Sequence, residues 1–357
     1  MTRAIGEGNI MHRLLRWTCA LVLAAGVAAP AHAQMRTLEV PPKTGWKHAQ
    51  TGVVLRAALA GYPRTGLVDN SAEEYDVMAS FAAPDNSTIV TVYIFQPALM
   101  SVPVWFDRAE SQILLRDVWG NAQPQGTPQA FARPGAAAAS GLRRIYVPGK
   151  GPYKSTGLAM MALGKWLVAV RISSSQFDTA QLDARMSDIV AAIGWPAGVA
   201  ESPVAVPVTA CAAPLAYAKR AKLKKADMND AIFGALLSGI TLEKEEKGEA
   251  VPVAAFCRDL PPTQMYGVYR APDANGYVMA MGDAGRTLSV GPSLAGLIEK
   301  SAGYSVSFGD VDGSTSVYPS FDKLPHPDQA LKALERSSPI SRSSKGGKDI
   351  TIGVPAK

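Results

Sequence analysis

TIVTVYIF, residues 88–95, is the most strand-like stretch of this 357-residue chain. Every residue in it is β-branched or aromatic, and these residue types fit best on a pleated strand. Both faces are apolar, as expected for a strand that is covered on two sides. We therefore predict that residues 88–95 form a central strand of a sheet, which ends before Pro97.

A helix is predicted downstream, over residues 103–117, with Phe106 and Ile113 on its apolar face. Four polar side chains lie off that face: Asp107, Arg108, Glu110 and Ser111. The chain then continues through a loop rich in proline and alanine before it returns to apolar, strand-like sequence. This half of the chain therefore mixes strands with helices.

Two further elements close the first half. Gly164 and Lys165 separate two apolar runs, which predicts a hairpin with a type II′ turn. Asp178 and Gln181 predict a helix that begins with a capping box, and Gly194 predicts its end.

The order of these elements resembles the PsbP-like fold of photosystem accessory proteins and bacterial envelope proteins. The resemblance covers residues 46–196. It rests on a strand that begins at Trp46, a meander that ends in TVYIF, a helix with Trp105 and Phe106, a hairpin and a closing helix. It implies an α-β-α sandwich with a binding or accessory role more often than catalysis. No functional residue is carried over, because no diagnostic residues match.

The domain organisation follows from composition. Residues 35–196 predict one α+β domain, and the Pro-, Ala- and Val-rich residues 197–214 predict a linker. Residues 215–336 predict a second α+β domain, and the Ser-, Gly- and Lys-rich residues 337–357 predict a flexible tail. We expect each domain to be a mainly antiparallel sheet packed with helices.

The second domain shows both helical and strand patterns. A basic helix is predicted at its start, with Ala231 and Ile232 on the apolar face, and a short helix is predicted from Pro292. Strands are predicted around residues 265–270 and 277–281, with a turn between them. The second half resembles no family that we can name.

The N-terminus predicts export. Residues 1–33 combine Arg13 and Arg16, an apolar run over residues 19–29 and an A-x-A pattern, so we expect cleavage before Gln34. A membrane anchor is the alternative, but the apolar run is too short to span a bilayer comfortably. The signal favours a bacterial periplasm, with secretion as the alternative.

Charge and hydropathy exclude some classes of protein. The net charge is +6, and removal of residues 1–33, with their three arginines and one glutamate, would leave +4. Such a mild excess does not indicate nucleic-acid binding. After cleavage, no apolar segment is long enough to predict a transmembrane span.

Cys211 and Cys257 are the only thiols that would remain after cleavage. Because an exported chain enters an oxidising compartment, we predict a structural disulfide between them. A metal site is not expected, because no His or further Cys lies near them in the sequence.

No catalytic constellation is found, and no cofactor is predicted. His48 and His326 are the histidines of the mature chain, and neither has a supporting motif, so surface or edge positions are predicted for both. The carboxylates Glu73, Glu74 and Asp76 are predicted to form a solvated group.

A basic cluster begins the second half: Lys219, Arg220, Lys222, Lys224 and Lys225. Such a cluster can contact anionic lipid head groups or an acidic partner. The alternative is a helix with a solvated basic face.

These observations favour an exported envelope protein with a non-enzymatic binding or accessory role, toward a partner protein or a small ligand. The alternative is a hydrolase that acts on an envelope polymer. Its site would lie between the two domains and would need two carboxylates with well-separated pKa values.

Overall fold

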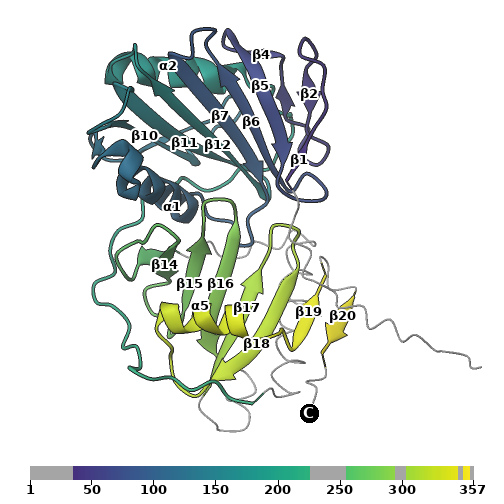
Figure 1. The fold of residues 1–357 in the computed structure, drawn as a ribbon, viewed down its shortest axis with the longest axis vertical. Helices are drawn as coiled ribbons and strands as arrows, with labels where there is room; N and C mark the ends of the chain where they lie inside the picture. Colours follow the sequence, from purple (N-terminus) through teal and green to yellow (C-terminus); the bar gives the residue numbers. More distant parts are fainter. Residues whose placement is uncertain (1–34, 226–254, 294–302, 345–348, 354–357) are drawn as a thin grey trace, which may run out of the picture. The chain divides into compact units, whose positions relative to one another are not determined.

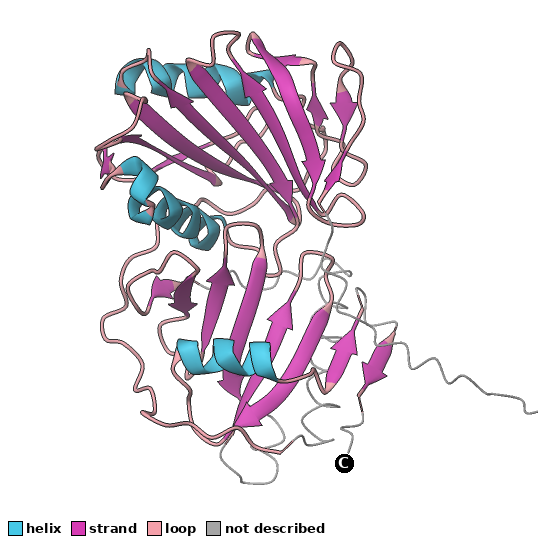
Figure 2. Cartoon of the chain, viewed as in Figure 1, coloured by secondary structure: helices cyan, strands magenta, loops and turns pink. Residues whose placement is uncertain are grey.

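A computed structural model describes residues 35–225, 255–293, 303–344 and 349–353. The predicted signal peptide, the predicted helix at Ala231 and the predicted helix after Pro292 lie outside these residues. The chain from Ala33 onward forms one compact unit. Two antiparallel sheets make up most of the described structure (Figures 1 and 2).

The first sheet is built around the TIVTVYIF strand, as the sequence predicts. That strand is β7 (Thr88–Phe95), and it pairs with β6 (Asp76–Ala82) on one side and β12 (Trp166–Ser174) on the other. The other strands of this sheet are β1 (Arg36–Thr37), β4 (Ala58–Leu59), β5 (Tyr62–Asp69), β8 (Gln123–Pro124), β9 (Gln129–Phe131), β10 (Gly141–Val147) and β11 (Ser155–Leu163). The path runs β1-β5-β6-β7-β12-β11-β10-β8, with β4 beside β5 and β9 beside β10. A small separate pair consists of β2 (Trp46–Lys47) and β3 (Val54–Leu55).

One helix packs on each face of the first sheet. The side chains of β11 alternate between two apolar clusters. Met161 packs in the cluster that contains α2 (Thr179–Ala192), whereas Met160 packs in the cluster that contains α1 (Val102–Leu115). A strand covered on both faces needs apolar residues at successive positions, and this explains the unbroken apolar run of β11 from Leu158 to Leu163.

The local signals of the first half are confirmed. Leu163 pairs with Trp166 across Gly164, whose φ is +60°, so the two-residue hairpin is present. The capping box of Asp178 and Gln181 begins α2. A short 3-10 helix, Asp117–Trp119, follows α1 where the sequence predicts that the longer helix ends.

The polar side of α1 is buried. The exposed fractions of Asp107, Arg108, Glu110 and Ser111 are 5%, 0%, 8% and 3%. Arg108 donates to three backbone carbonyls of the second half, at Thr263, Gln264 and Gly282, with distances of 2.5–2.7 Å. These acceptors are more than 150 residues away in the sequence, so the pattern of the helix alone does not reveal them.

The second sheet is a meander in which the strands follow chain order. Its strands are β13 (Cys257–Arg258), β14 (Tyr266–Arg270), β15 (Tyr277–Met281), β16 (Arg286–Pro292), β17 (Tyr304–Gly309), β18 (Thr315–Phe321), β19 (Ser341–Ser343) and β20 (Ile350–Ile352). Within the described ranges its one helix is α5 (Pro327–Arg336), whose Ala330 and Ala333 join the core of the sheet. The mixed class of antiparallel sheet and helix is therefore confirmed, but the expectation of sheets packed with helices overstates the helical content.

The segment after α5 departs from the expected flexible tail, because β19 and β20 extend the edge of the second sheet. Ser341 and Ser343 are each 2% exposed, although serine-rich sequence is typical of loops. Cross-strand pairing with β18 decides the conformation here, and composition does not report such pairing. The predicted domain boundaries stay predictions.

Candidate functional site

The disulfide between Cys211 and Cys257 is present, as the sequence predicts. It joins the segment before the basic cluster to β13, and the two Cα atoms lie 4.9 Å apart. Backbone pairing continues beside it, because Cys211 N donates to Arg258 O at 2.9 Å and Arg258 N donates to Thr209 O at 2.8 Å. Such a bond fits an oxidising compartment outside the cytoplasm.

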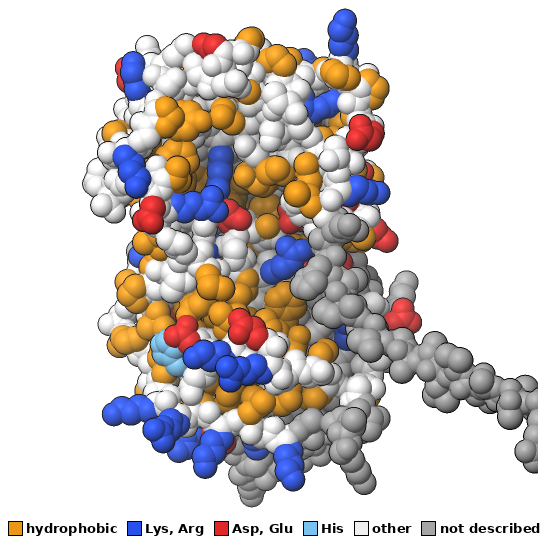
Figure 3. Space-filling model, in the orientation of Figure 1, with side chains coloured by type: hydrophobic (Ala, Val, Ile, Leu, Met, Phe, Trp, Pro, Cys, Tyr) orange, Lys and Arg blue, Asp and Glu red, His pale blue; other side chains and the backbone are white. Residues whose placement is uncertain are grey.

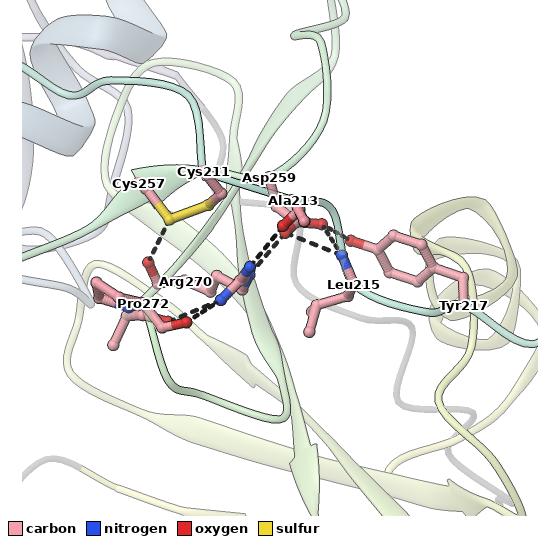
Figure 4. Close-up of a disulfide and its surroundings, with 9 residues drawn as sticks. Cys211, Ala213, Leu215, Tyr217, Cys257, Asp259, Arg270 and Pro272 are labelled. Carbon is pink, nitrogen blue, oxygen red and sulfur yellow. Dashed lines mark hydrogen bonds and ion pairs between the residues drawn. A yellow bond between two sulfur atoms is a disulfide. The ribbon is translucent and has the colours of Figure 1, made fainter.

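Asp259 lies next to this disulfide and holds the same segment (Figure 4). Its carboxylate accepts from Leu215 N at 3.2 Å, from the Tyr217 hydroxyl and from Arg270 Nε at 2.7 Å. Arg270 also donates to the carbonyl of Ala213 at 2.7 Å. Burial, and then the bond to Asp259, raise the pKa of Tyr217, so this hydroxyl stays protonated as a donor. A carboxylate with one cationic and two neutral donors is satisfied inside the protein.

We call residues 211–225 the basic strap, since they run from the disulfide to the last lysine of the basic cluster. The strap forms no helix and pairs with the end of β18 and the segment that follows it, which corrects the alternative prediction of a basic helix. Ala218 forms a bridge with Pro325, and Leu223 forms a bridge with Phe321. Lys224 N donates to Ser320 O at 2.8 Å, so strap backbone groups pair across to another segment rather than within a helix.

The alternation of apolar side chains explains why the strap is extended. Leu215, Tyr217 and Ala221 pack against the core of the second sheet. Leu215 and Tyr217 are two residues apart, so they lie on one face of an extended chain, whereas on a helix they would lie on nearly opposite sides.

The strap presents its cations to solvent. All five side chains of the basic cluster are exposed. None of them pairs with a carboxylate of the described residues, and Leu223 between them is 42% exposed. Figure 3 shows Lys and Arg side chains gathered along the edge where the strap runs in Figure 1. The strap therefore carries a band of exposed positive charge that no carboxylate of the described ranges neutralises.

The remaining candidates do not join this band. His48 is fully buried, unlike the surface or edge histidine that we expected, and its Nε2 bonds to the carbonyl of Glu74 at 2.7 Å. Burial lowers the pKa of His48. His326 caps α5 at its N-terminus. Across residues 35–225 and the later described ranges, no three His, Cys, Asp or Glu side chains gather as a metal site.

Asp76, which we expected in a solvated group, is 2% exposed at the start of β6. Burial raises its pKa to about 6, against the opposing effect of Arg286, whose Nη1 lies 3.6 Å from Oδ2. The folded protein therefore binds a proton here between about pH 4 and pH 6, where the unfolded chain has lost it. Stability must fall as pH rises through that window.

Asp76→Asn is expected to remove this pH dependence. Below about pH 3 the variant and the parent should have similar free energies of unfolding, because the aspartate is neutral in both states. Above about pH 7 the variant should be more stable by about 2–3 kcal/mol, since the parent buries a charge. Urea unfolding of both proteins at a series of pH values measures the difference. A constant difference at all pH values would contradict the shifted pKa.

Helices of the described segments are all too short or too polar to cross a membrane. Comparison of the chain with protein-family models, with curated proteins and with solved structures finds no match.

Proposed function

We propose that this chain is an exported, non-enzymatic accessory protein of the bacterial envelope, and that it docks on an anionic lipid surface through the basic strap. The observation that carries the proposal is the band of five exposed cations, none paired with a carboxylate that the structure describes, on a strap that a disulfide and Asp259 hold in place. The disulfide and the leader-like N-terminus support an exported location, with the periplasm preferred over full secretion. The PsbP-like pattern of residues 46–196 supports an accessory role.

Lipid is a better fit than an acidic protein because of Leu223. An exposed leucine between Lys222 and Lys224 can enter the interfacial region while the flanking ammonium groups stay at the head groups. Each Lys or Arg near an anionic membrane contributes about 1 kcal/mol, so five supply about 5 kcal/mol at low salt. An ordered backbone also lowers the conformational entropy that binding would cost.

The triple variant Lys222→Glu, Lys224→Glu, Lys225→Glu is expected to abolish binding to vesicles of anionic phosphatidylglycerol. Three attractions become repulsions, a change of about 6 kcal/mol, which exceeds the total attraction of the strap. The parent should bind in low salt and detach near 0.5 M salt, roughly where the screening length falls below 5 Å. Co-sedimentation with vesicles measures both effects, and neutral phosphatidylcholine vesicles should not bind the protein.

A matched control carries the same charge change elsewhere. Lys43, Lys150 and Lys165 are exposed and lie outside the strap. Their joint replacement by Glu should leave more than half of the binding in place. If the parent does not bind anionic vesicles at low salt, the proposal is wrong. If both triple variants lose binding equally, net charge rather than the strap is responsible.

The alternative, a hydrolase acting on an envelope polymer, has no comparable support. Among the described carboxyl groups, burial raises the pKa of Asp76 to about 6 and also raises the pKa of Asp107, and both residues are almost completely buried. A group in that position cannot reach a polymer chain without a large rearrangement.

A further inference from the structure

A cavity of about 490 Å³ lies between α2 and the strands β9, β10 and β11, apart from the basic strap. Its volume falls in the range of small-molecule sites, about 300–1,000 Å³. Phe131, Ala159, Met186 and Val190 give it an apolar wall. Two arginines, Arg133 and Arg143, supply its charged side chains.

A tight turn fixes Arg133 at the cavity. Ala136 N donates to Arg133 O at 3.1 Å, with Pro134 second and Gly135 third in the turn. Gly135 has a φ of +78°, which a type II turn requires at that position and which glycine adopts without strain. The guanidinium lies 5.6 Å from the centre of the Trp195 ring.

Arg133 is a buried cation for which the described residues supply no counter-charge. It is 5% exposed, and it donates to the carbonyls of Ala162 at 3.3 Å and Pro134 at 3.1 Å. No carboxylate in the described parts of the chain forms an ion pair with it. Burial of an uncompensated charge is costly, so a guanidinium placed at a cavity favours an anion inside it.

Arg143 differs from Arg133 because its charge is already compensated. Its Nη2 lies 3.3 Å from Asp183 Oδ2, and its Nη1 donates to Ser187 Oγ at 2.8 Å. Its Nε is buried and has no hydrogen-bond partner among the described residues. The cavity therefore offers one positive charge that no described carboxylate compensates, beside an apolar wall.

We propose that this cavity binds a small amphipathic monocarboxylate, with the carboxylate on Arg133 and the apolar body against Phe131, Met186 and Val190. The planar guanidinium matches a carboxylate in a bidentate manner. A single uncompensated charge favours a monoanion over a phosphate monoester, which carries about −1.5 to −2. This inference is independent of the strap and of lipid docking.

Calorimetric titration of the protein with decanoate, decanol and acetate tests the proposal. Decanoate is expected to bind at least tenfold more tightly than decanol, which has the chain but no charge, and acetate, which has no chain, should give no signal. In Arg133→Met, decanoate should bind only as well as decanol does. Arg185→Met, on α2 but outside the cavity and paired with Asp188, should bind like the parent.

A second variant tests the cavity even if Arg133→Met fails to fold. Ser187 lines the cavity from the exposed side of α2, so Ser187→Phe should fold and fill part of the space. It is expected to weaken decanoate and decanol binding alike, by at least tenfold. Equal affinity of the parent for decanoate and decanol, or unchanged decanoate binding in Ser187→Phe, would overturn the proposal, and so would no decanoate binding at all.

Discussion

Replacing Arg108 by methionine is expected to lower the free energy of unfolding by about 3–5 kcal/mol. The side chain is 0% exposed, and it donates through Nε, Nη1 and Nη2 to carbonyls of the second half. Methionine has a similar length but no donor. The variant would therefore leave buried carbonyl groups without their hydrogen bonds, and each such group costs about 1–3 kcal/mol.

Part of this loss is offset. Burial lowers the pKa of Arg108, which shows that the folded protein bears a desolvation cost for this cation, and methionine removes that cost. The carbonyl of Gln264 also keeps its bond from Gln112 Nε2 at 2.6 Å. The carbonyls of Thr263 and Gly282 have no such second donor among the described hydrogen bonds. The net effect should still be strongly destabilising.

Urea unfolding measures the effect of Arg108→Met, and Arg116→Met supplies the control. Arg116 comes directly after α1 and is exposed. Its Nε donates to Gln112 Oε1 of α1 at 3.2 Å. Its replacement should change stability by less than about 0.5 kcal/mol. Arg108→Lys should fall between the two, because lysine keeps the charge but lacks the planar fork that reaches three acceptors. Parent-like stability of Arg108→Met would show that these bonds contribute nothing in solution.

Local sequence signals predicted where helices and strands form better than they predicted which distant residues contact them. The composition of residues 88–95 predicted a central strand, and Asp178 with Gln181 predicted a helix start, because both signals act within a few residues. The polar side of α1 illustrates the opposite case. Arg108 finds its acceptors at Thr263, Gln264 and Gly282, and no pattern within one helix encodes a partner so far away in the sequence.

The sequence predicted which residues make up the candidate site but not the backbone conformation that holds them. The two remaining cysteines and the five cations were recognised from residue type alone. The apolar contacts of Leu215, Tyr217 and Ala221 with the core of the second sheet favour a non-helical strap, a weak signal that the run of lysines concealed. The role of Asp259 was not predicted, because nothing in the sequence around this single aspartate indicates the three donors that bind its carboxylate.

Removing the disulfide, with Cys211→Ser and Cys257→Ser together, is expected to lower the free energy of unfolding by about 4 kcal/mol. The two cysteines are 46 positions apart, and closing a loop of this length in the unfolded chain accounts for that amount in the chain-entropy description. Urea unfolding with and without dithiothreitol measures it. The parent should lose the same stability in reductant, whereas the double variant should be unaffected by it.

The double variant also separates the stability of the strap from its contact with lipid. Asp259 still holds Leu215 and Tyr217 after the bond is lost, and Lys224 N still pairs with Ser320 O at 2.8 Å. Under native conditions we therefore expect the variant to bind anionic vesicles within about twofold of the parent. Loss of vesicle binding without loss of folding would mean that the disulfide itself, rather than Asp259 and the pairing with β18, keeps the cations in place. If dithiothreitol does not change the free energy of unfolding of the parent, the predicted bond between Cys211 and Cys257 is contradicted.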